Sequence, residues 1–228
     1  MDNRIADYRS RLLKLATTNV SDALDALNLK GATYGINAMW PGTPKIVGRA
    51  VTMRMIPAGV TAPQVHASVE AIDAAQAGDV IVVDSGGRLD TNAWGGVVAA
   101  GAKMKKLSGV VVDGAVRDVD DCMELEFPVY ARGKVVTTAR GRTIIDGTNI
   151  MIQFGGVQVR PGDIVFADIN GVVIIPQERI DEVVKRAEAL YEREQQMVKD
   201  IQAGMSMVEV DKKYRYEQML TKNHPASE

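Results

Sequence analysis

The sequence contains few of the residues that build disulfides or zinc sites. Among 228 residues there is one cysteine, Cys122, and there are two histidines, His66 and His224. A single cysteine excludes an internal disulfide and agrees with a reducing compartment, so we expect a cytoplasmic protein. Zinc sites built from cysteine and histidine are excluded by the same count. Any metal would therefore take oxygen ligands, which favours Mg²⁺ or Mn²⁺.

The sequence also lacks an excess of one charge and long apolar runs. Its 27 basic and 29 acidic residues give a net charge of −2, which argues against a dedicated nucleic-acid binder. The longest stretch without a charged side chain is 15 residues, 55–69, and it contains Pro57, Gly59 and Pro63. No membrane span fits there, and residues 1–10 lack the apolar core of a signal peptide. We expect neither a nucleic-acid nor a membrane partner.

What is present is the composition of a globular protein, 46% hydrophobic and 25% charged. The length suits one large domain. An apolar stripe predicts helix over the first 30 residues, with a break near residues 17–19, where Asn19 or Ser21 would cap the second piece. A strand is predicted over Ile46–Ile56 and a short helix over Pro63–Gln76, in which His66 would be a packed side chain.

The middle of the chain predicts a β-α-β-α-β unit. Its strands are the apolar runs 80–83, 110–112 and 128–130, and its helices are 95–107 and 117–125. Strands that are apolar on both faces are typical of a parallel sheet covered by helices. Cys122 would be a small buried hydrophobe within the second helix.

The C-terminal part predicts more strands and then one long helix. Strands are expected at 135–139, 156–159, 164–167 and 172–175, and Ile169-Asn170-Gly171 suits a hairpin turn. A heavily charged helix is predicted from Gln177 to about Gln202, and a polar tail follows Gly204.

Two strand ends carry residues suited to chemistry, and ligands of open parallel sheets bind at such ends. At the first, Gly95-Gly96 begins a helix. Free backbone N–H groups there form an anion cradle, although the glycines could equally permit close helix–sheet packing. At the second, Arg117-Asp118 follows the next strand. A guanidinium binds a carboxylate bidentately, and a carboxylate holds a hard divalent cation. The alternative is a surface ion-pair cluster.

These residues resemble those of the RraA-like family, which contains regulator-of-ribonuclease-activity proteins and class II pyruvate aldolases. The resemblance runs from Thr17–Ala23 through Val47–Thr52 and Ala77–Val80 to Pro128–Arg132, and its most specific part is Gly109–Asp118. It implies an α/β fold: an RraA-like swivelling-domain α/β sandwich with a parallel βαβ core and a long C-terminal helix. Residues 1–176 would form that domain, and residues 177–228 would pack on a neighbouring subunit.

The resemblance also implies a site between subunits of a homotrimer or homohexamer. Arg117 would bind the carboxylate and carbonyl end of a small 2-oxo or hydroxy acid substrate, and Asp118 would anchor Mg²⁺ or Mn²⁺. The backbone N–H groups of Val97 and Val98, next to Gly95-Gly96, would complete the carboxylate pocket. A glutamate of the neighbouring C-terminal helix would reach the water shell of the metal, with Glu194 the first choice and Glu192 the second.

One departure from the family pattern concerns residue 96. The aldolases commonly have Gly-Asp or Gly-Glu where this chain has Gly95-Gly96, and that acid positions water for proton transfer. Asp84 or Asp90 could substitute, or this branch could act on another substrate. Because decarboxylation of oxaloacetate needs no base for a hydroxyl proton, loss of the acid should impair aldol cleavage more than decarboxylation.

Three functions remain open on this reading. The first is a metal-dependent carbon–carbon lyase that releases pyruvate from 4-hydroxy-2-oxo acids or oxaloacetate, with the cation and Arg117 stabilising an enolate. The second is a non-catalytic RraA-type regulator that binds a protein partner. The third is a metal-dependent lyase or hydratase of another hydroxy-acid pathway.

Overall fold

The computed structural model describes residues 3–60 and 67–215. Four neighbouring parallel strands form its centre: β2 (Ile46–Pro57), β3 (Val80–Asn92), β4 (Gly109–Val116) and β5 (Val129–Lys134). The connections between them carry α3 (Ala67–Ala74), α4 (Gly96–Met104) and α5 (Val119–Glu124). The predicted β-α-β-α-β unit is confirmed, and its strands are buried on both faces because helices and a second layer of chain cover them.

Antiparallel strands extend this sheet on the β2 side. There β9 (Ile164–Asp168) pairs with the first half of β2, β10 (Gly171–Ile175) pairs with β9, and β6 (Thr143–Thr148) pairs with the second half of β2. At the opposite edge β1 (Asn37–Ala38) lies on β5. Residues 31–33 in turn exchange backbone hydrogen bonds with β10. One short segment therefore bridges both edges and brings the sheet close to a closed barrel.

The nearly closed sheet separates three buried clusters. The inner cluster is capped by the hairpin β7 (Ile152–Phe154) and β8 (Val157–Val159). A second cluster lies between the outer face of β2–β5 and helices α3–α5, and it includes Trp94 and Phe127. The third joins β9 and β10 to the remaining helices. Strand residues alternate between the inner and outer clusters, as period-2 side chains must.

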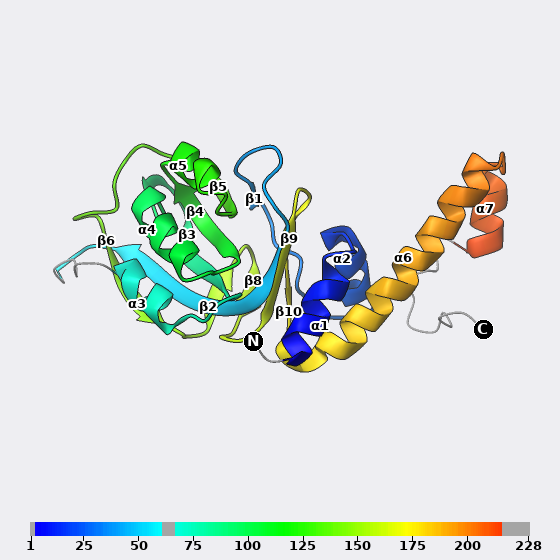
Figure 1. The fold of residues 1–228 in the computed structure, drawn as a ribbon, viewed down its shortest axis with the longest axis horizontal. Helices are drawn as coiled ribbons and strands as arrows, with labels where there is room; N and C mark the ends of the chain where they lie inside the picture. The colour runs from blue at the N-terminus through cyan, green and yellow to red at the C-terminus, as the bar shows by residue number, and fades with distance from the viewer. Residues whose placement is uncertain (1–2, 61–66, 216–228) are drawn as a thin grey trace.

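The helices of the third cluster are α1 (Asn3–Leu12), α2 (Thr17–Ala26), α6 (Ile180–Gln202) and α7 (Met207–Tyr214). Helix α6 is entered through a 3₁₀ turn, Gln177–Arg179, and α7 contributes Val210. Figure 1 shows these helices on the opposite side of the sheet from α3–α5. The far end of α6 projects beyond the body together with α7. In the part of the chain described, none of these helices has the length and apolar character that a membrane span requires.

The sequence placed several boundaries wrongly. Strand β3 runs to Asn92 rather than ending at Val83, because Gly86 and Gly87 adopt positive φ and form bulges instead of ending the strand. Strand β4 likewise runs to Val116, and β6, β7 and α7 were not predicted. The strand expected at 135–139 is irregular, because its backbone bonds to the ends of β3 and β4 rather than to a ladder.

The helical predictions were mostly right. The break in the N-terminal helix is present, but α2 begins at Thr17, so neither Asn19 nor Ser21 is its N-cap. The Asn19 side chain instead accepts a hydrogen bond from Ala16 N at 3.0 Å. The helix predicted over Pro63–Gln76 is seen as Ala67–Ala74, and His66 lies outside the described residues. Cys122 is buried, as expected.

Candidate functional site

The segments that follow β3 and β4 are joined by two hydrogen bonds, each donated by a backbone N–H group. Arg117 N donates to Trp94 O at 3.0 Å, and Gly96 N donates to the Asp118 carboxylate, Oδ2, at 3.1 Å. A Cβ atom on Gly95 would lie 2.8 Å from that oxygen and 3.5 Å from Arg117 Nε. Glycine at residue 95 therefore allows the Arg117-Asp118 side chains to approach the backbone, and the first N–H of α4 is held by Asp118.

Arg117 and Asp118 are held in a defined geometry. Asp118 adopts left-handed backbone angles, with φ of 51° at the start of α5, a strained conformation that often marks functional positions. Arg117 Nε lies 3.3 Å from Asp118 Oδ2 as an ion pair. The same Nε is buried and has no hydrogen-bond partner among the described residues. Its charge is paired with that of Asp118, and the ion pair holds the guanidinium beside the start of α4.

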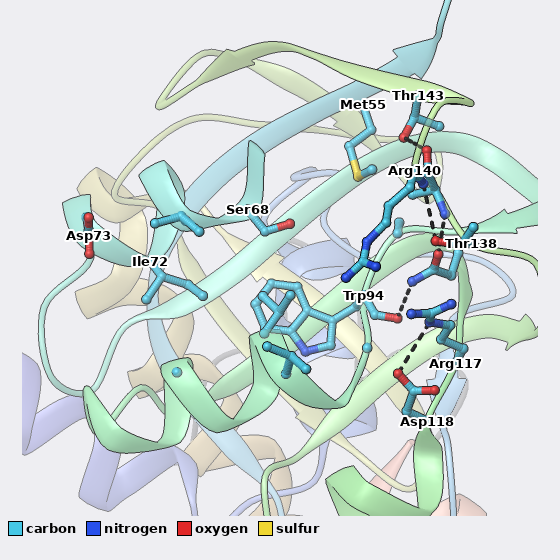
Figure 2. Close-up of a pocket in the computed structure, with 18 of the residues that line it drawn as sticks. Met55, Ser68, Ile72, Asp73, Trp94, Arg117, Asp118, Thr138, Arg140 and Thr143 are labelled. Atoms are coloured by element: carbon cyan, nitrogen blue, oxygen red, sulfur yellow. Dashed lines mark hydrogen bonds and ion pairs between the residues drawn. The ribbon is translucent and has the colours of Figure 1, made fainter. Parts of the chain in front are cut away.

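These two residues line a cavity of about 790 Å³. Figure 2 shows Arg117 and Asp118 at one end, Trp94 on the wall, and Arg140 and Thr138 reaching in from the segment before β6. Much of the remaining lining is apolar and comes from α3 and α4. Cavities of this size bind small molecules when a few polar groups converge in them.

The cavity collects most of the site residues named from the sequence. Gly95, Val97, Val98, Arg117 and Asp118 line it. The first turn of α4 contributes its N–H groups, since the first bond of the helix ladder there runs from Ala99 N to Gly95 O.

Glu194 lies elsewhere in the chain. It is on α6, where its carboxylate accepts a hydrogen bond from Asn19 Nδ2 at 2.7 Å. Burial and the nearby Asp22 carboxylate raise the pKa of Glu194. Glu194 or Glu192 would reach Asp118 from a second copy of the chain. The role of either glutamate at the metal therefore stays a prediction.

A different acid from those expected lies beside Gly96. Asp84 pairs with Arg54 and Asp90 pairs with Arg88, and neither carboxylate lines the cavity. The carboxylate of Asp121, on α5, instead fills the space that a side chain at residue 96 would occupy. Asp121 and Gly96 are 25 residues apart, and no local pattern in the sequence indicated that they are in contact.

The oxygen atoms that could bind a metal in this cavity suit a hard cation that keeps most of its water ligands. Within the described ranges no group of three histidine, cysteine, aspartate or glutamate side chains could enclose a metal ion. Asp118 offers one carboxylate whose Oδ1 makes no hydrogen bond inside the described chain. Magnesium is commonly held by one or two carboxylates, the substrate and water, so Asp118 fits this cation and no cysteine or histidine is needed.

Several lining residues were missed by sequence reasoning. Asn92 bridges two segments, because its Nδ2 donates to Trp94 O at 3.0 Å and its Oδ1 accepts from Ala139 N at 2.7 Å. Trp94 stacks on Phe127 with ring centroids 6.3 Å apart. Thr138 lies in the stretch that was expected to be a strand, 135–139, and Arg140 directly follows it. The one sequence feature that could have indicated these lining residues was Trp94, which directly precedes Gly95-Gly96.

The fold and the site define a mixed α/β protein with a pocket, lined by Arg117 and Asp118, at the ends of two parallel strands. Residues 17–174 match the family model RraA-like, described as aldolase/RraA. The chain therefore belongs to the RraA-like family, as its motifs indicated.

Curated relatives and solved structures agree with this assignment. The chain is 34% identical over 182 residues, 79% of its length and 82% of the relative, to a Halalkalibacterium halodurans protein provisionally named as a 4-hydroxy-4-methyl-2-oxoglutarate aldolase. It is 32% identical to protein DlpA of Legionella pneumophila over 91% of this chain and only 34% of that protein.

Two solved structures have the same architecture. An uncharacterised protein from Pseudomonas syringae superposes with a TM-score of 0.81 at 30% identity, covering 90% of this chain and 96% of the other. Streptomyces coelicolor RraAS2, described as an unusual member of the RNase ES inhibitor RraA family, gives 0.75 at 25% identity, covering 87% and 96%. The predicted fold class, an α/β sandwich of the RraA type, is confirmed.

Proposed function

We propose that this protein is a divalent-cation-dependent carbon–carbon lyase that releases pyruvate from small 2-oxo acids. The observation that carries the proposal is the position of Arg117 and Asp118, which form an ion pair of 3.3 Å and line the cavity beside the first turn of α4. A carboxylate seated there would receive charge-assisted bonds from Arg117 and backbone bonds from Val97 and Val98. The provisional aldolase name of the Halalkalibacterium relative supports the same reaction class.

The chemistry follows from what the pocket would hold. A 2-oxo acid presents a carboxylate and a keto oxygen on adjacent carbons. When its C3–C4 bond breaks, the electron pair stays on C3 as the enolate of pyruvate, and C4 leaves as CO₂ from oxaloacetate or as a carbonyl compound once a base has taken the proton of the 4-hydroxyl group. A proton from water then converts the enolate to pyruvate. Asp118 would hold a Mg²⁺ or Mn²⁺ ion, and such an ion would supply positive charge to stabilise the enolate. Arg117 orients the carboxylate and adds a second positive charge, and Asp118 keeps Arg117 in place through their ion pair.

A pyruvate-release assay tests this function directly. Wild-type protein with Mg²⁺ or Mn²⁺ should release pyruvate from oxaloacetate, from 4-hydroxy-4-methyl-2-oxoglutarate, or from both, and EDTA should abolish the release. Asp118→Ala should lower kcat/KM by about 100-fold or more, whereas Asp120→Ala, an exposed carboxylate of the same helix, should have little effect. Activity that survives EDTA or Asp118→Ala would defeat the mechanism.

A regulatory role is the second candidate, because the RraAS2 structure belongs to a family of ribonuclease inhibitors. That role predicts no turnover and a protein partner whose activity changes on binding. The third candidate is a lyase or hydratase that acts on another hydroxy acid. Turnover of such an acid, but not of oxaloacetate or 4-hydroxy-4-methyl-2-oxoglutarate, would favour it.

We also propose assembly into a homotrimer or homohexamer with sites between subunits. The far end of α6 and α7 project from the body (Figure 1) and carry exposed apolar side chains, including Val198, Ile201, Met207 and Val208. A neighbouring subunit could cover them and bring its Glu194 to the site. Sedimentation equilibrium should give a trimer or hexamer mass, and a monomer would contradict the assembly.

A further inference from the structure

We propose that Asn92 is a positioning residue of the Arg117 site. Its side chain fixes the backbone of Trp94 and Gly95, and through that backbone the turn that receives the carboxylate of the substrate. The inference rests on the proposed function, because it takes this turn as the place where a 2-oxo acid binds. Asn92 acts on the shape of the site and takes no part in breaking bonds.

The Asn92 side chain joins two walls of the cavity. Asn92 is the last residue of β3 and is 8% exposed. Its Nδ2 donates a hydrogen bond to Trp94 O at 3.0 Å, and its Oδ1 accepts one from Ala139 N at 2.7 Å. The backbone N of Asn92 also donates to Thr137 O, at 3.0 Å. Trp94 and Thr138, from the two segments that Asn92 joins, both line the cavity (Figure 2).

The carbonyl oxygen of Trp94 connects Asn92 to the site. It accepts hydrogen bonds from Asn92 Nδ2 and from Arg117 N, both at 3.0 Å, so two donors fix its direction. The Trp94 ring is 1% exposed and stacks on Phe127, which fixes the side chain as well. The carbonyl belongs to the same planar peptide group as the N–H of Gly95. Orienting one end of this group therefore orients the backbone that enters α4.

The two contacts of the Asn92 side chain require an amide. A carbonyl oxygen only accepts and a backbone N–H only donates, so the two partners assign Nδ2 and Oδ1. A carboxylate at residue 92 could accept from Ala139 N, but it would place a second oxygen against Trp94 O. An alanine would leave both partners without this bond. The two substitutions therefore disturb the site in different ways, one by repulsion and the other by loss of contacts.

Asn92 could instead stabilise the fold alone. The two interpretations differ in what changes while the protein stays folded, because only a positioning residue alters the affinity for a ligand of the Arg117 site. Oxalate is a suitable probe of that site. Its adjacent carboxylate groups present the same oxygen pattern as the carboxylate and keto oxygen of a 2-oxo acid, and it binds without turnover.

Calorimetric titration of oxalate in the presence of Mg²⁺, at pH 8 and at pH 5.5, tests the role. In Asn92→Asp the introduced carboxyl group is ionised at pH 8 and repels Trp94 O, so the Kd should rise about tenfold above that of wild type. In acid the carboxyl group takes up a proton, and its O–H can donate to Trp94 O. Because burial raises the pKa of such a group, the Kd at pH 5.5 should return to within about threefold of wild type.

Two further variants complete the test. Asn92→Ala should raise the Kd by about five- to tenfold at both pH values, because it has no group to protonate. Asn37→Asp is the matched control, since it adds the same carboxyl group at an exposed residue of β1 outside the cavity lining. Its Kd should equal that of wild type at both pH values. Comparing each variant with wild type at the same pH removes the effect of pH on oxalate and on the cation.

Circular dichroism shows which variants are folded at each pH. A folded Asn92→Asp protein that binds oxalate like wild type at pH 8, or that is weakened equally at both pH values, would overturn the positioning role. If only Asn92→Asp fails to fold, an unchanged Kd in Asn92→Ala would overturn it. Loss of folded protein in both variants would assign Asn92 to stability instead.

The wild-type titration separates these outcomes from failure of the proposed function. Wild-type protein that binds oxalate with Mg²⁺ leaves the proposed lyase site intact, whatever the Asn92 variants do. Wild-type protein that binds no oxalate under these conditions sinks the proposed lyase site, and the role of Asn92 falls with it.

Discussion

The carboxylate of Asp121 occupies the place of a side chain at Gly96. A Cβ atom on Gly96 would lie 2.9 Å from Asp121 Cβ, closer than real Cβ contacts, and 3.0 Å from Asp121 Cγ, which is tighter than most of them. The backbone of Gly96 is ordinary helix and its φ is not positive. Sterics from α5, rather than backbone conformation, therefore favour glycine there.

This relationship predicts a compensating pair of substitutions. Gly96→Asp should destabilise the protein by about 1–2 kcal/mol, because a side chain is forced against Asp121 and two like charges meet. Gly96→Asp combined with Asp121→Gly should recover most of the loss. Urea unfolding of both single variants and the double variant measures the coupling. Strict additivity of the two changes would show that the contact is unimportant.

Removing the buried Asp168 carboxylate should loosen the start of α2. Asp168 is 1% exposed and accepts hydrogen bonds from Thr17 N at 2.9 Å and Thr17 Oγ1 at 2.7 Å. It also accepts from Asn170 N at 2.9 Å. Asp168→Ala leaves these donors unpaired, so we expect a loss of about 2–3 kcal/mol in the free energy of unfolding.

Thermal unfolding gives the readout, with a fall of several degrees expected for Asp168→Ala. Asp25→Ala, an exposed aspartate of α2, is the control and should shift the midpoint little. Equal shifts for the two variants would contradict the stabilisation of α2 by the hydrogen bonds of Asp168.

The ion pair between α1 and α6 should make stability depend on pH. Arg11 Nε and Nη2 lie 2.8 and 2.6 Å from the two carboxylate oxygens of Glu188, and this pairing lowers the pKa of Glu188. Because the folded pKa is below the unfolded one, the stabilisation is present at neutral pH and is lost as pH falls through the folded value.

Glu188→Gln should therefore cost about 0.5–1 kcal/mol at pH 7 and progressively less in acid. Chemical denaturation between pH 7 and pH 3 measures the difference. Glu192→Gln, exposed on the same helix, should show no such trend. A Glu188→Gln effect that persists undiminished in acid would mean that packing, rather than charge, is responsible.

Cys122 should be unreactive until the protein unfolds. The thiol is 1% exposed, and burial, aided by nearby aspartates, raises its pKa to about 11. At pH 8 only roughly one thiol in a thousand would then be thiolate, the form that attacks alkylating reagents. Iodoacetamide labelling followed by mass spectrometry should give almost no product in native protein and full labelling in urea. Rapid labelling of native protein would refute this.

Much of the fold could be predicted because the decisive signals are local. The runs 80–83 and 110–112 are apolar on both faces, a pattern that favours buried parallel strands. The charged helix after Gln177 has a regular apolar stripe. The errors fall where tertiary contacts override local signals, as at Gly86 and Gly87, which continue β3 through bulges rather than ending it.

The sequence by itself determined the strand–helix alternation, the absence of cysteine and histidine metal sites, and the motif Gly109–Asp118 that marks the family. Only the tertiary structure decided that Asp121 lies against Gly96, that Asn92 ties the two halves of the cavity together, and that Arg140 points into it. The physical reason is distance along the chain. Periodicity and turn chemistry act over a few residues, whereas these contacts join segments 25 to 47 residues apart that only sheet pairing brings together.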